Sequence, residues 1–238
     1  MLPIADPVCG LCGERLSGRY VVEDGIPRCS DCRQMEPLFA KAVAYGSYDL
    51  GLRELIHLLK YEQVRPAANV LGRMLAEAIE CLAPAFSMDP PLVVPVPLHR
   101  EKLRQRGFNQ SELIAQAALK MRPAGRDWRL DAAVLERVRP TGSQTGLTRP
   151  QRIENVRGAF AVRRDVAGRE VLLVDDVFTT GTTASECARV LRKAGADRVW
   201  VATVARVLRV EPAFQEIPVF DDEQDTKQER SKAVAAGV

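Results

Sequence analysis

Apolar positions along the chain change their period several times, and these changes predict alternating strands and helices. A period of two, or a short apolar run, predicts strands over residues 42–48, 92–96, 133–138, 171–174 and 198–207. Apolar residues at helical spacing predict helices over residues 52–61, from Pro66 onward, and over 111–121 and 184–195. Strands that alternate with helices form a parallel sheet joined by right-handed crossovers. The pattern therefore predicts an α/β domain, a parallel sheet flanked by helices.

Residues 1–40 lack this pattern and carry four cysteines instead. Their two C-x-x-C pairs are separated by sixteen residues, a spacing typical of four-cysteine zinc sites, whereas a redox role would need only one pair. Two residues between thiolates let one tight turn aim both sulfurs at one ion. So small a module cannot fold on its apolar residues alone, so zinc is expected to stabilise it. The predicted zinc ligands are Cys9, Cys12, Cys29 and Cys32, and a hairpin turning at Asp24-Gly25 is predicted between the pairs.

The chain is predicted to divide into three parts. Residues 1–40 form the zinc-ribbon module, residues 41–210 form the α/β domain, and residues 211–238 form a disordered tail because the periodicity stops near Val210. No run approaches 18 apolar residues, so no membrane insertion is predicted. The first residues, MLPIADPVCGLC, do not have the regions of a secretory signal. The protein is therefore expected to be cytoplasmic.

The sequence VLLVDDVFTTGTT, residues 171–183, combines two features that need an explanation. Asp175 and Asp176 repel each other, yet they stand side by side where a buried parallel strand is predicted to end, and ligands bind beyond such ends. The loop that follows leads into a helix N-terminus, where unpaired N–H groups and the helix dipole bind anions. Two carboxylates suit a sugar diol or a hydrated magnesium ion. Acid pair and anion cradle together predict a site for a ribose 5-phosphate.

Other phosphate-binding motifs do not account for this stretch. A Walker A loop requires Gly-Lys-Ser/Thr, and a dinucleotide fingerprint requires G-x-G-x-x-G; neither is present here. A plain helix N-cap would explain one aspartate, but neither the second nor the threonine-glycine run.

Several stretches of the chain resemble known families. VLLVDDVFTTGTT resembles the phosphoribosyl-pyrophosphate (PRPP) motif of type I phosphoribosyltransferases. Together with the paired C-x-x-C module, PVPLHREKLRQRGFNQSELIA and SQTGLTRPQRIENVRGAF resemble the ComF family. Members of that family are phosphoribosyltransferase-like proteins with an N-terminal zinc ribbon, linked in some bacteria to natural transformation. The resemblance spans residues 9 to about 206, and some members of the wider family bind PRPP only as a signal.

The resemblance implies a role for each of several residues. Asp175 and Asp176 would bind the ribose hydroxyls, and the residues for the 5-phosphate would be Thr179, Thr180, Gly181, Thr182 and Thr183. A turn for pyrophosphate would consist of Pro97, Leu98, His99 and Arg100. Residues 139–155 would form a mobile lid. That segment also shows neither helical nor strand periodicity, and long structureless loops are usually functional or disordered. Closure would exclude water, with Arg149 and Arg152 as the catalytic candidates that neutralise the departing diphosphate; an ordinary flexible surface loop is the alternative.

Charge is distributed unevenly along the chain. The tail from Glu211 carries seven acids and three bases, whereas residues 99–164 carry fifteen Lys/Arg and six Asp/Glu. So basic a segment usually faces the phosphates of a nucleotide or a nucleic acid, although a solvated surface would carry the same charge. Phe108 and Trp128 are its only aromatic residues before residue 160, a poor platform for stacking bases.

Three functions are compatible with the sequence. The leading hypothesis is an enzyme that transfers phosphoribose from PRPP, with magnesium, to an unidentified acceptor and releases pyrophosphate. The alternative is a non-catalytic competence protein that handles single-stranded DNA, with other DNA-uptake proteins as partners, and keeps the PRPP site as a sensor or relic. The third is an interaction scaffold whose zinc ribbon docks a partner.

Overall fold

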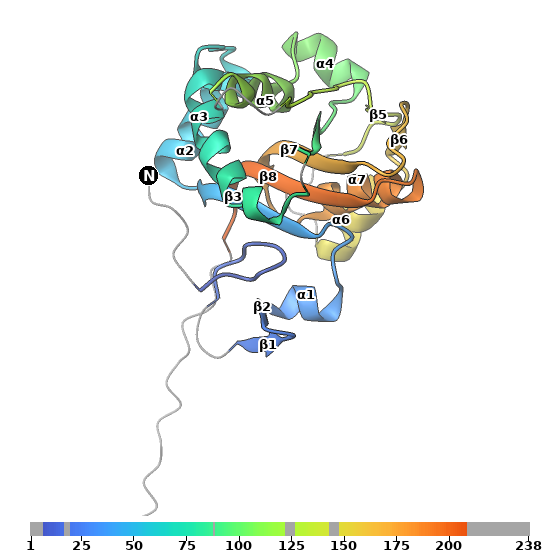
Figure 1. Ribbon diagram of the computed structural model, residues 1–238. Helices are drawn as coiled ribbons and strands as arrows, with labels where there is room; N and C mark the ends of the chain where they lie inside the picture. Colours follow the sequence, from blue (N-terminus) through green and yellow to red (C-terminus); the bar gives the residue numbers. More distant parts are fainter. Residues whose placement is uncertain (1–6, 17–19, 88, 122–126, 143–147, 209–238) are drawn as a thin grey trace, which may run out of the picture.

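The computed structural model describes residues 7–16, 20–87, 89–121, 127–142 and 148–208. Within these ranges the main sheet has four parallel strands, in the order β3-β8-β7-β4. Their bounds are β3 Lys41–Ser47, β4 Leu92–Pro95, β7 Glu170–Phe178 and β8 Arg198–Arg206. This confirms the predicted parallel sheet (Figure 1). The predicted tail, residues 211–238, lies outside the described residues.

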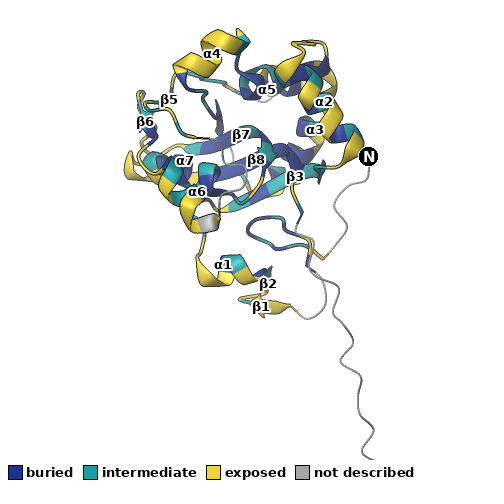
Figure 2. Cartoon of the chain, turned by 180° about the vertical axis from the view of Figure 1, so that it is seen from behind, coloured by how far each residue is buried: buried dark blue, intermediate teal, exposed yellow. Residues whose placement is uncertain are grey.

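Helices cover both faces of the sheet, as Figures 1 and 2 show from opposite sides. The helices over one face are α2 (Leu50–Tyr61), α3 (Ala67–Glu80) and α5 (Gln110–Lys120). On the other face lie α7 (Thr182–Lys193) and, packed against it, α6 (Arg149–Val156). Successive residues of a strand point to opposite faces, so Leu172 and Val174 join the first core, while Val171 and Leu173 join the second. A continuous apolar run is therefore what this strand requires.

The cysteine module lies below the sheet in Figure 1. Its hairpin consists of β1 (Val21–Glu23) and β2 (Ile26–Arg28), and the predicted turn at Asp24-Gly25 is confirmed because both residues have positive φ. Helix α1 (Ser30–Gln34) carries Cys32. The backbone N–H of Ala42 donates to the carbonyl oxygen of Leu11 at 2.7 Å. This bond ties the module to β3, while the proposed boundary at residue 40 stays a prediction.

Two predictions about local structure were wrong. The strand predicted over residues 133–138 is β5 (Leu135–Arg137), but it pairs antiparallel with β6 (Phe160–Val162) instead of joining the parallel sheet. The segment 139–155, predicted to be without structure, contains α6 from Arg149 onward. A capping box explains this helix, because Thr148 and Gln151 satisfy each other's backbone N–H groups. Pro150, in the first turn, favours the same start. Residues 143–147 of this segment lie outside the described residues.

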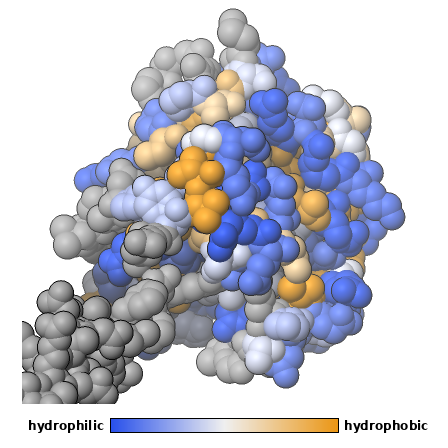
Figure 3. Space-filling model, turned by 90° about the horizontal axis from the view of Figure 1, so that it is seen from below, coloured by the Kyte–Doolittle hydropathy of each residue, from blue (hydrophilic) through white to orange (hydrophobic). Residues whose placement is uncertain are grey.

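The short helix α4 (Arg100–Arg106) and the 3₁₀ turn η1 (Ala83–Ala85) were not predicted. Two smaller predictions are confirmed: the side chain of Asn109 caps α5 by accepting from the backbone N–H of Ser111, and Gly195 takes positive φ just after α7. Figure 3 shows, from below, a surface that is mostly hydrophilic with small apolar groups between. No helix within the described ranges is long and apolar enough to cross a membrane.

Gly72 provides a test of the packing between α3 and α5. A Cβ at this position would lie 2.5 Å from the Cβ of Ala117 and 2.9 Å from the backbone nitrogen of Ala118. Helix propensity alone would make Gly72→Ala stabilising by about 1 kcal/mol. We expect a loss of about 1–3 kcal/mol instead, because the two helices must separate. Urea unfolding of Gly72→Ala measures whether the variant gains or loses stability, and Asn69→Ala, an exposed position in α3, is the control. A Gly72→Ala variant that is more stable than the unaltered protein would contradict the close packing of α3 and α5.

Candidate phosphoribosyl-binding site

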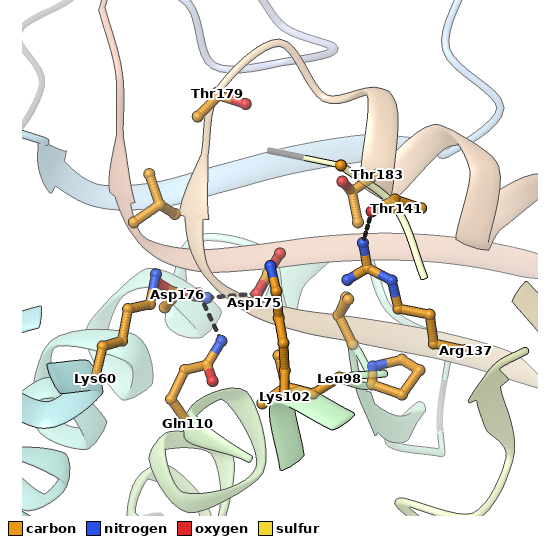
Figure 4. A pocket seen from close by; sticks show the side chains of 14 residues that line it. Lys60, Leu98, Lys102, Gln110, Arg137, Thr141, Asp175, Asp176, Thr179 and Thr183 are labelled. Carbon is orange, nitrogen blue, oxygen red and sulfur yellow. Dashed lines mark hydrogen bonds and ion pairs between the residues drawn. The ribbon is translucent and has the colours of Figure 1, made fainter. Parts of the chain in front are cut away.

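A pocket of about 560 Å³ opens at the carboxyl ends of the neighbouring strands β7 and β4, of which β4 lies at the edge of the sheet. Asp175 and Asp176, near the end of β7, form its floor with side chains from α2, α4 and α5 (Figure 4). The charged and amide-bearing lining residues are Lys60, Lys102, Gln110, Arg137, Asp175 and Asp176. Pro97 and Leu98 line the pocket beside them, as do Thr141, Gly142, Thr179 and Thr183. The acid pair and part of the predicted threonine loop therefore face one space.

The repulsion between the two aspartates is offset by donors from α2 and α5. Asp176 is only 3% exposed, and the ammonium of Lys60 forms an ion pair with its Oδ2. The side chain of Gln110 donates to Asp176 Oδ1 at 3.3 Å. Asp175 Oδ1 accepts two hydrogen bonds of 2.9 Å, one from the hydroxyl of Ser111 and one from the backbone N–H of Asp176. Asp175 Oδ2 is thus the one carboxylate oxygen of the pair that accepts no hydrogen bond and forms no ion pair with a described residue.

These contacts set the protonation of the pair. Burial raises the pKa of Asp175 to about 7, and the neighbouring charge of Asp176 adds to the effect. Burial would also raise the pKa of Asp176, but attraction to Lys60 outweighs it and holds the pKa below its usual value. The pKa of Lys60 is raised because Asp176 more than compensates for burial of the ammonium. At neutral pH Asp176 is therefore ionised, while Asp175 titrates.

The threonine-glycine loop runs from the end of β7 into the first turn of α7. Gly181 has a φ of 74° and forms the N-cap of α7, which has no side-chain cap. A Cβ at Gly181 would lie 2.5 Å from the ring of Phe178, so close an approach admits only glycine. The hydroxyls of Thr180 and Thr182 lie 3.2 Å apart. The loop presents hydroxyls and uncapped helical N–H groups, which is the chemistry an anion site requires.

The predicted pyrophosphate turn divides between two environments. Pro97 and Leu98 line the pocket, whereas His99 is a buried N-cap of α4 and Arg100 is exposed; neither of these two is a lining residue. Lys102, two residues further on, does line the pocket. Burial lowers the pKa of Lys102, and repulsion by Arg137 and Arg106 lowers it further.

Lys60 and Arg137 were not predicted as site residues, and both line the pocket. Figure 4 shows Lys60 on one side of the carboxylates and Arg137 on the other, where its guanidinium donates to the hydroxyl of Thr141. Burial lowers the pKa of Arg137. The alternation within β5, where Leu135 is buried and Glu136 exposed, is a signal for the strand, but no local pattern marks the arginine as a pocket residue.

The two arginines predicted for the lid lie on α6. Arg152 is half-buried and does not line the pocket, and the side chain of Arg149 lies outside the described residues. Thr141 and Gly142, at the start of the same segment, do reach the pocket. Their presence places the beginning of segment 139–155 beside the acid pair.

The four cysteines come together as predicted. The sulfur atoms of Cys9, Cys12, Cys29 and Cys32 all lie within 4.8 Å of one another, and all four residues are buried. The Sγ atoms of Cys12 and Cys29 are 3.7 Å apart, close to the edge of about 3.8 Å that a tetrahedron with zinc–sulfur bonds of about 2.3 Å would have. Gly13 follows the first pair with a φ of 72°. This donor set is compatible with structural zinc.

Removal of Lys60 would leave the buried charge of Asp176 without its cation. We expect Lys60→Met to lose stability near the lower end of about 3–5 kcal/mol at pH 8, because the Lys60 side chain is 20% exposed. The pKa of Asp176 should then rise above that of the unfolded chain. The free energy of unfolding should therefore fall as pH increases through that range, and the deficit should be smallest at acidic pH.

The double variant Lys60→Met/Asp176→Asn is the control, since it removes both charges and should recover most of the loss. Urea unfolding at several pH values measures all three proteins. Equal stability of Lys60→Met and the unaltered protein at pH 8 would show that the ion pair contributes nothing.

Comparison with known proteins shows which family this chain belongs to. Residues 111–230 match the phosphoribosyl transferase domain family. The chain is 32% identical over 208 residues to Competence protein F of Haemophilus influenzae, covering 84% of this chain and 85% of that protein. It is 31% identical over 210 residues to the DNA utilization protein YhgH of Escherichia coli K12, covering 84% and 91%. A solved structure, glutamine phosphoribosylpyrophosphate amidotransferase from B. subtilis, covers 59% of this chain and 26% of its own, with 25% identity and a TM-score of 0.35. The chain belongs to the ComF family of phosphoribosyltransferase-like proteins with an N-terminal four-cysteine cluster.

Proposed function

We propose that the protein binds PRPP in the pocket at the end of β7 and transfers its phosphoribosyl group to an acceptor not yet identified. One observation carries this proposal: two carboxylates stand directly before an uncapped helix N-terminus, with three cations around the same pocket. A sugar bearing phosphates at both ends matches this distribution of charge. The names of the relatives link the family to competence and DNA utilization, so a role in natural transformation belongs to the proposal.

The ligand would span the pocket from the threonine-glycine loop to the turn at Pro97 and Leu98. Its 5-phosphate would accept hydrogen bonds from the loop at the N-terminus of α7. This loop consists of Thr179, Thr180, Gly181, Thr182 and Thr183. A ribose hydroxyl would donate to the Oδ2 atom of Asp175, while Asp176 holds Lys60 against the sugar. The diphosphate would lie near Lys102 and Arg137, beside the turn at Pro97 and Leu98. His99 and Arg100 would support that turn from outside the pocket.

The reaction would exchange one bond at the anomeric carbon. The acceptor's lone pair would form the new bond as the bond to the diphosphate oxygen breaks, and that electron pair would leave with pyrophosphate, so the carbon inverts. Lys102 and Arg137 would stabilise the departing charge. Magnesium, when it enters with the diphosphate, would supply further neutralisation, and Asp175 Oδ2 is the carboxylate oxygen available to its water shell. The lid arginines Arg149 and Arg152 remain proposed partners of the diphosphate.

Calorimetry with PRPP and Mg²⁺ tests the acid pair. Because hydroxyl groups donate to a carboxylate, affinity should rise as Asp175 ionises near pH 7. Asp175→Asn should bind roughly 10–100-fold more weakly at pH 8, the value of a charge-assisted hydrogen bond. The difference between the two proteins should shrink at pH 6, where Asp175 is protonated, which separates this effect from titration of the ligand's own phosphates.

Parallel pH profiles for the two proteins would exclude Asp175 as a ribose ligand. Loss of binding in Asp175→Asn/Asp176→Asn, with binding kept by the exposed-residue variant Asn69→Ala, would support the pocket. Incubation with a panel of bases and amines, with pyrophosphate release measured, then separates an enzyme from a sensor. A protein that binds PRPP but releases no pyrophosphate with any acceptor would favour the sensor.

The second candidate is a non-catalytic protein that handles single-stranded DNA, together with other DNA-uptake proteins. The exposed residues Arg100 and Arg104 on α4, within the basic segment, favour it. Against it, Phe108 is buried and Trp128 is half-buried against Phe86, so the segment offers a poor platform for stacking bases. If DNA binds through phosphates, its affinity should fall steeply between 50 and 200 mM salt, by about a thousandfold for six contacts. Fluorescence anisotropy with a labelled oligonucleotide measures this, and salt-insensitive or absent binding would remove the candidate.

A further inference from the structure

Arg206, the last residue of β8, is a buried cation that does not line the polar pocket. It is 3% exposed, and its guanidinium reaches into the cysteine module. One terminal nitrogen donates to the backbone carbonyl of Cys12. The other donates to Glu14 Oε2 at 2.7 Å and lies 3.6 Å from the sulfur of Cys12. All these acceptors belong to the turn that carries the first cysteine pair.

The same guanidinium also contacts the strand that carries the acid pair. It lies 4.6 Å from the centre of the Phe178 ring, a cation–π contact made without competing water. Phe178 is the last residue of β7 and directly precedes Thr179. The ring of Phe39 packs edge-on against the Phe178 ring, with 6.0 Å between the ring centres. The ring of Phe178 is also the group that a Cβ at Gly181 would meet at 2.5 Å. Phe178 thus supports the turn at Gly181 from beneath.

The cysteine cluster and the threonine loop therefore share a set of contacts. A second pocket, of about 270 Å³, has Cys12, Cys32, Phe178, Thr180 and Arg206 in its lining. From cluster to loop the order of contacts is Cys12, Arg206, Phe178 and Gly181. No described residue outside the cysteine turn accepts a hydrogen bond from the Arg206 guanidinium.

The position of this turn depends on the cluster. The N–H of Cys9 donates to the carbonyl of Glu14, and that of Gly13 donates to the carbonyl of Cys9, so one loop presents both cysteines and the acceptors of Arg206. A metal bound by the sulfurs would fix this loop, because small four-cysteine modules gain their folding free energy from the ion. Without the metal, the acceptors that hold a buried guanidinium in place would lose their fixed geometry.

We propose that Arg206 is a positioning residue through which the cysteine-bound metal sets the affinity of the Gly181 loop for a ribose 5-phosphate. This inference rests on the proposed function, since it assumes that the loop binds that phosphate. It assigns the cysteine module a role beyond its own folding. Pyrophosphate, which would bind by Lys102 and Arg137, is predicted to be insensitive to the same contacts because neither residue belongs to them.

The test compares two ligands on the full chain by calorimetry. Ribose 5-phosphate probes the loop, and inorganic pyrophosphate probes the opposite end of the pocket. Arg206→Met and Phe178→Leu should each weaken ribose 5-phosphate binding by about tenfold or more, the size of a typical coupling between sites. Pyrophosphate binding should stay within about twofold. Arg198→Met is the matched control, since Arg198 is an exposed arginine at the other end of β8.

A second arm uses the unaltered protein and avoids variants that fail to fold. Chelation of the metal, with metal content and circular dichroism recorded, should weaken ribose 5-phosphate binding while pyrophosphate binding persists, and added Zn²⁺ should restore it. Arg206→Lys, which keeps the cation, should recover part of the affinity lost in Arg206→Met.

The outcomes separate this inference from the proposed function. If the unaltered, metal-loaded protein binds neither ligand, the proposed function fails and the inference fails with it. If it binds both, and chelation or Arg206→Met weakens both ligands equally, Arg206 has only a structural role and the inference is overturned. Ribose 5-phosphate affinity that is unchanged in both arms overturns it as well.

Discussion

The neutralisation of the acid pair at the end of β7 is the constraint on which the site depends. Two adjacent carboxylates cannot both be buried and ionised unless cations and donors surround them. Lys60 supplies the charge for Asp176, and Gln110 and Ser111 supply hydrogen bonds. These donors come from α2 and α5, so both helices must pack on one face of the sheet before the site exists. The apolar stripes of α2 and α5 therefore hold the helices on the sheet, and this packing places the polar residues at their ends beside the acid pair.

The sequence predicted those parts of the structure that are local. The fold class followed from the alternation of periods, because burial on both faces demands an apolar β7. The acid pair and the threonine loop could be recognised because all their groups lie within thirteen consecutive residues. The four cysteines could equally be recognised as a metal site from the sequence, since their spacing reflects the geometry of one ion. In each case a short segment contains the whole chemical reason for its own pattern.

The parts that sequence reasoning missed depend on contacts between distant segments. Lys60 meets Asp176 across more than a hundred residues, and nothing near either residue specifies the other. Arg137 lies on β5, which pairs with β6 outside the parallel sheet, and its approach to the pocket depends on this distant pairing. Helix α6 was missed for a different reason: its capping box was present in the sequence, but its apolar face is short and the surrounding residues suggested a loop.

The charges of the pocket restrict what it can bind. Lys60 is matched by Asp176, so the remaining pocket charges are Lys102, Arg137 and an Asp175 that is only partly ionised at neutral pH. Burial lowers the pKa of Lys102, and repulsion by Arg137 and Arg106 lowers it further, so a bound anion would favour the charged form of Lys102. A neutral sugar or base would leave this repulsion in place. A ligand with a diphosphate at one end relieves it, and its hydroxyls in turn favour the ionised form of Asp175. The adjacent acids are therefore unequal partners: Asp176 is paired with Lys60, whereas Asp175 titrates near neutral pH and, under the proposed function, would respond to the ligand.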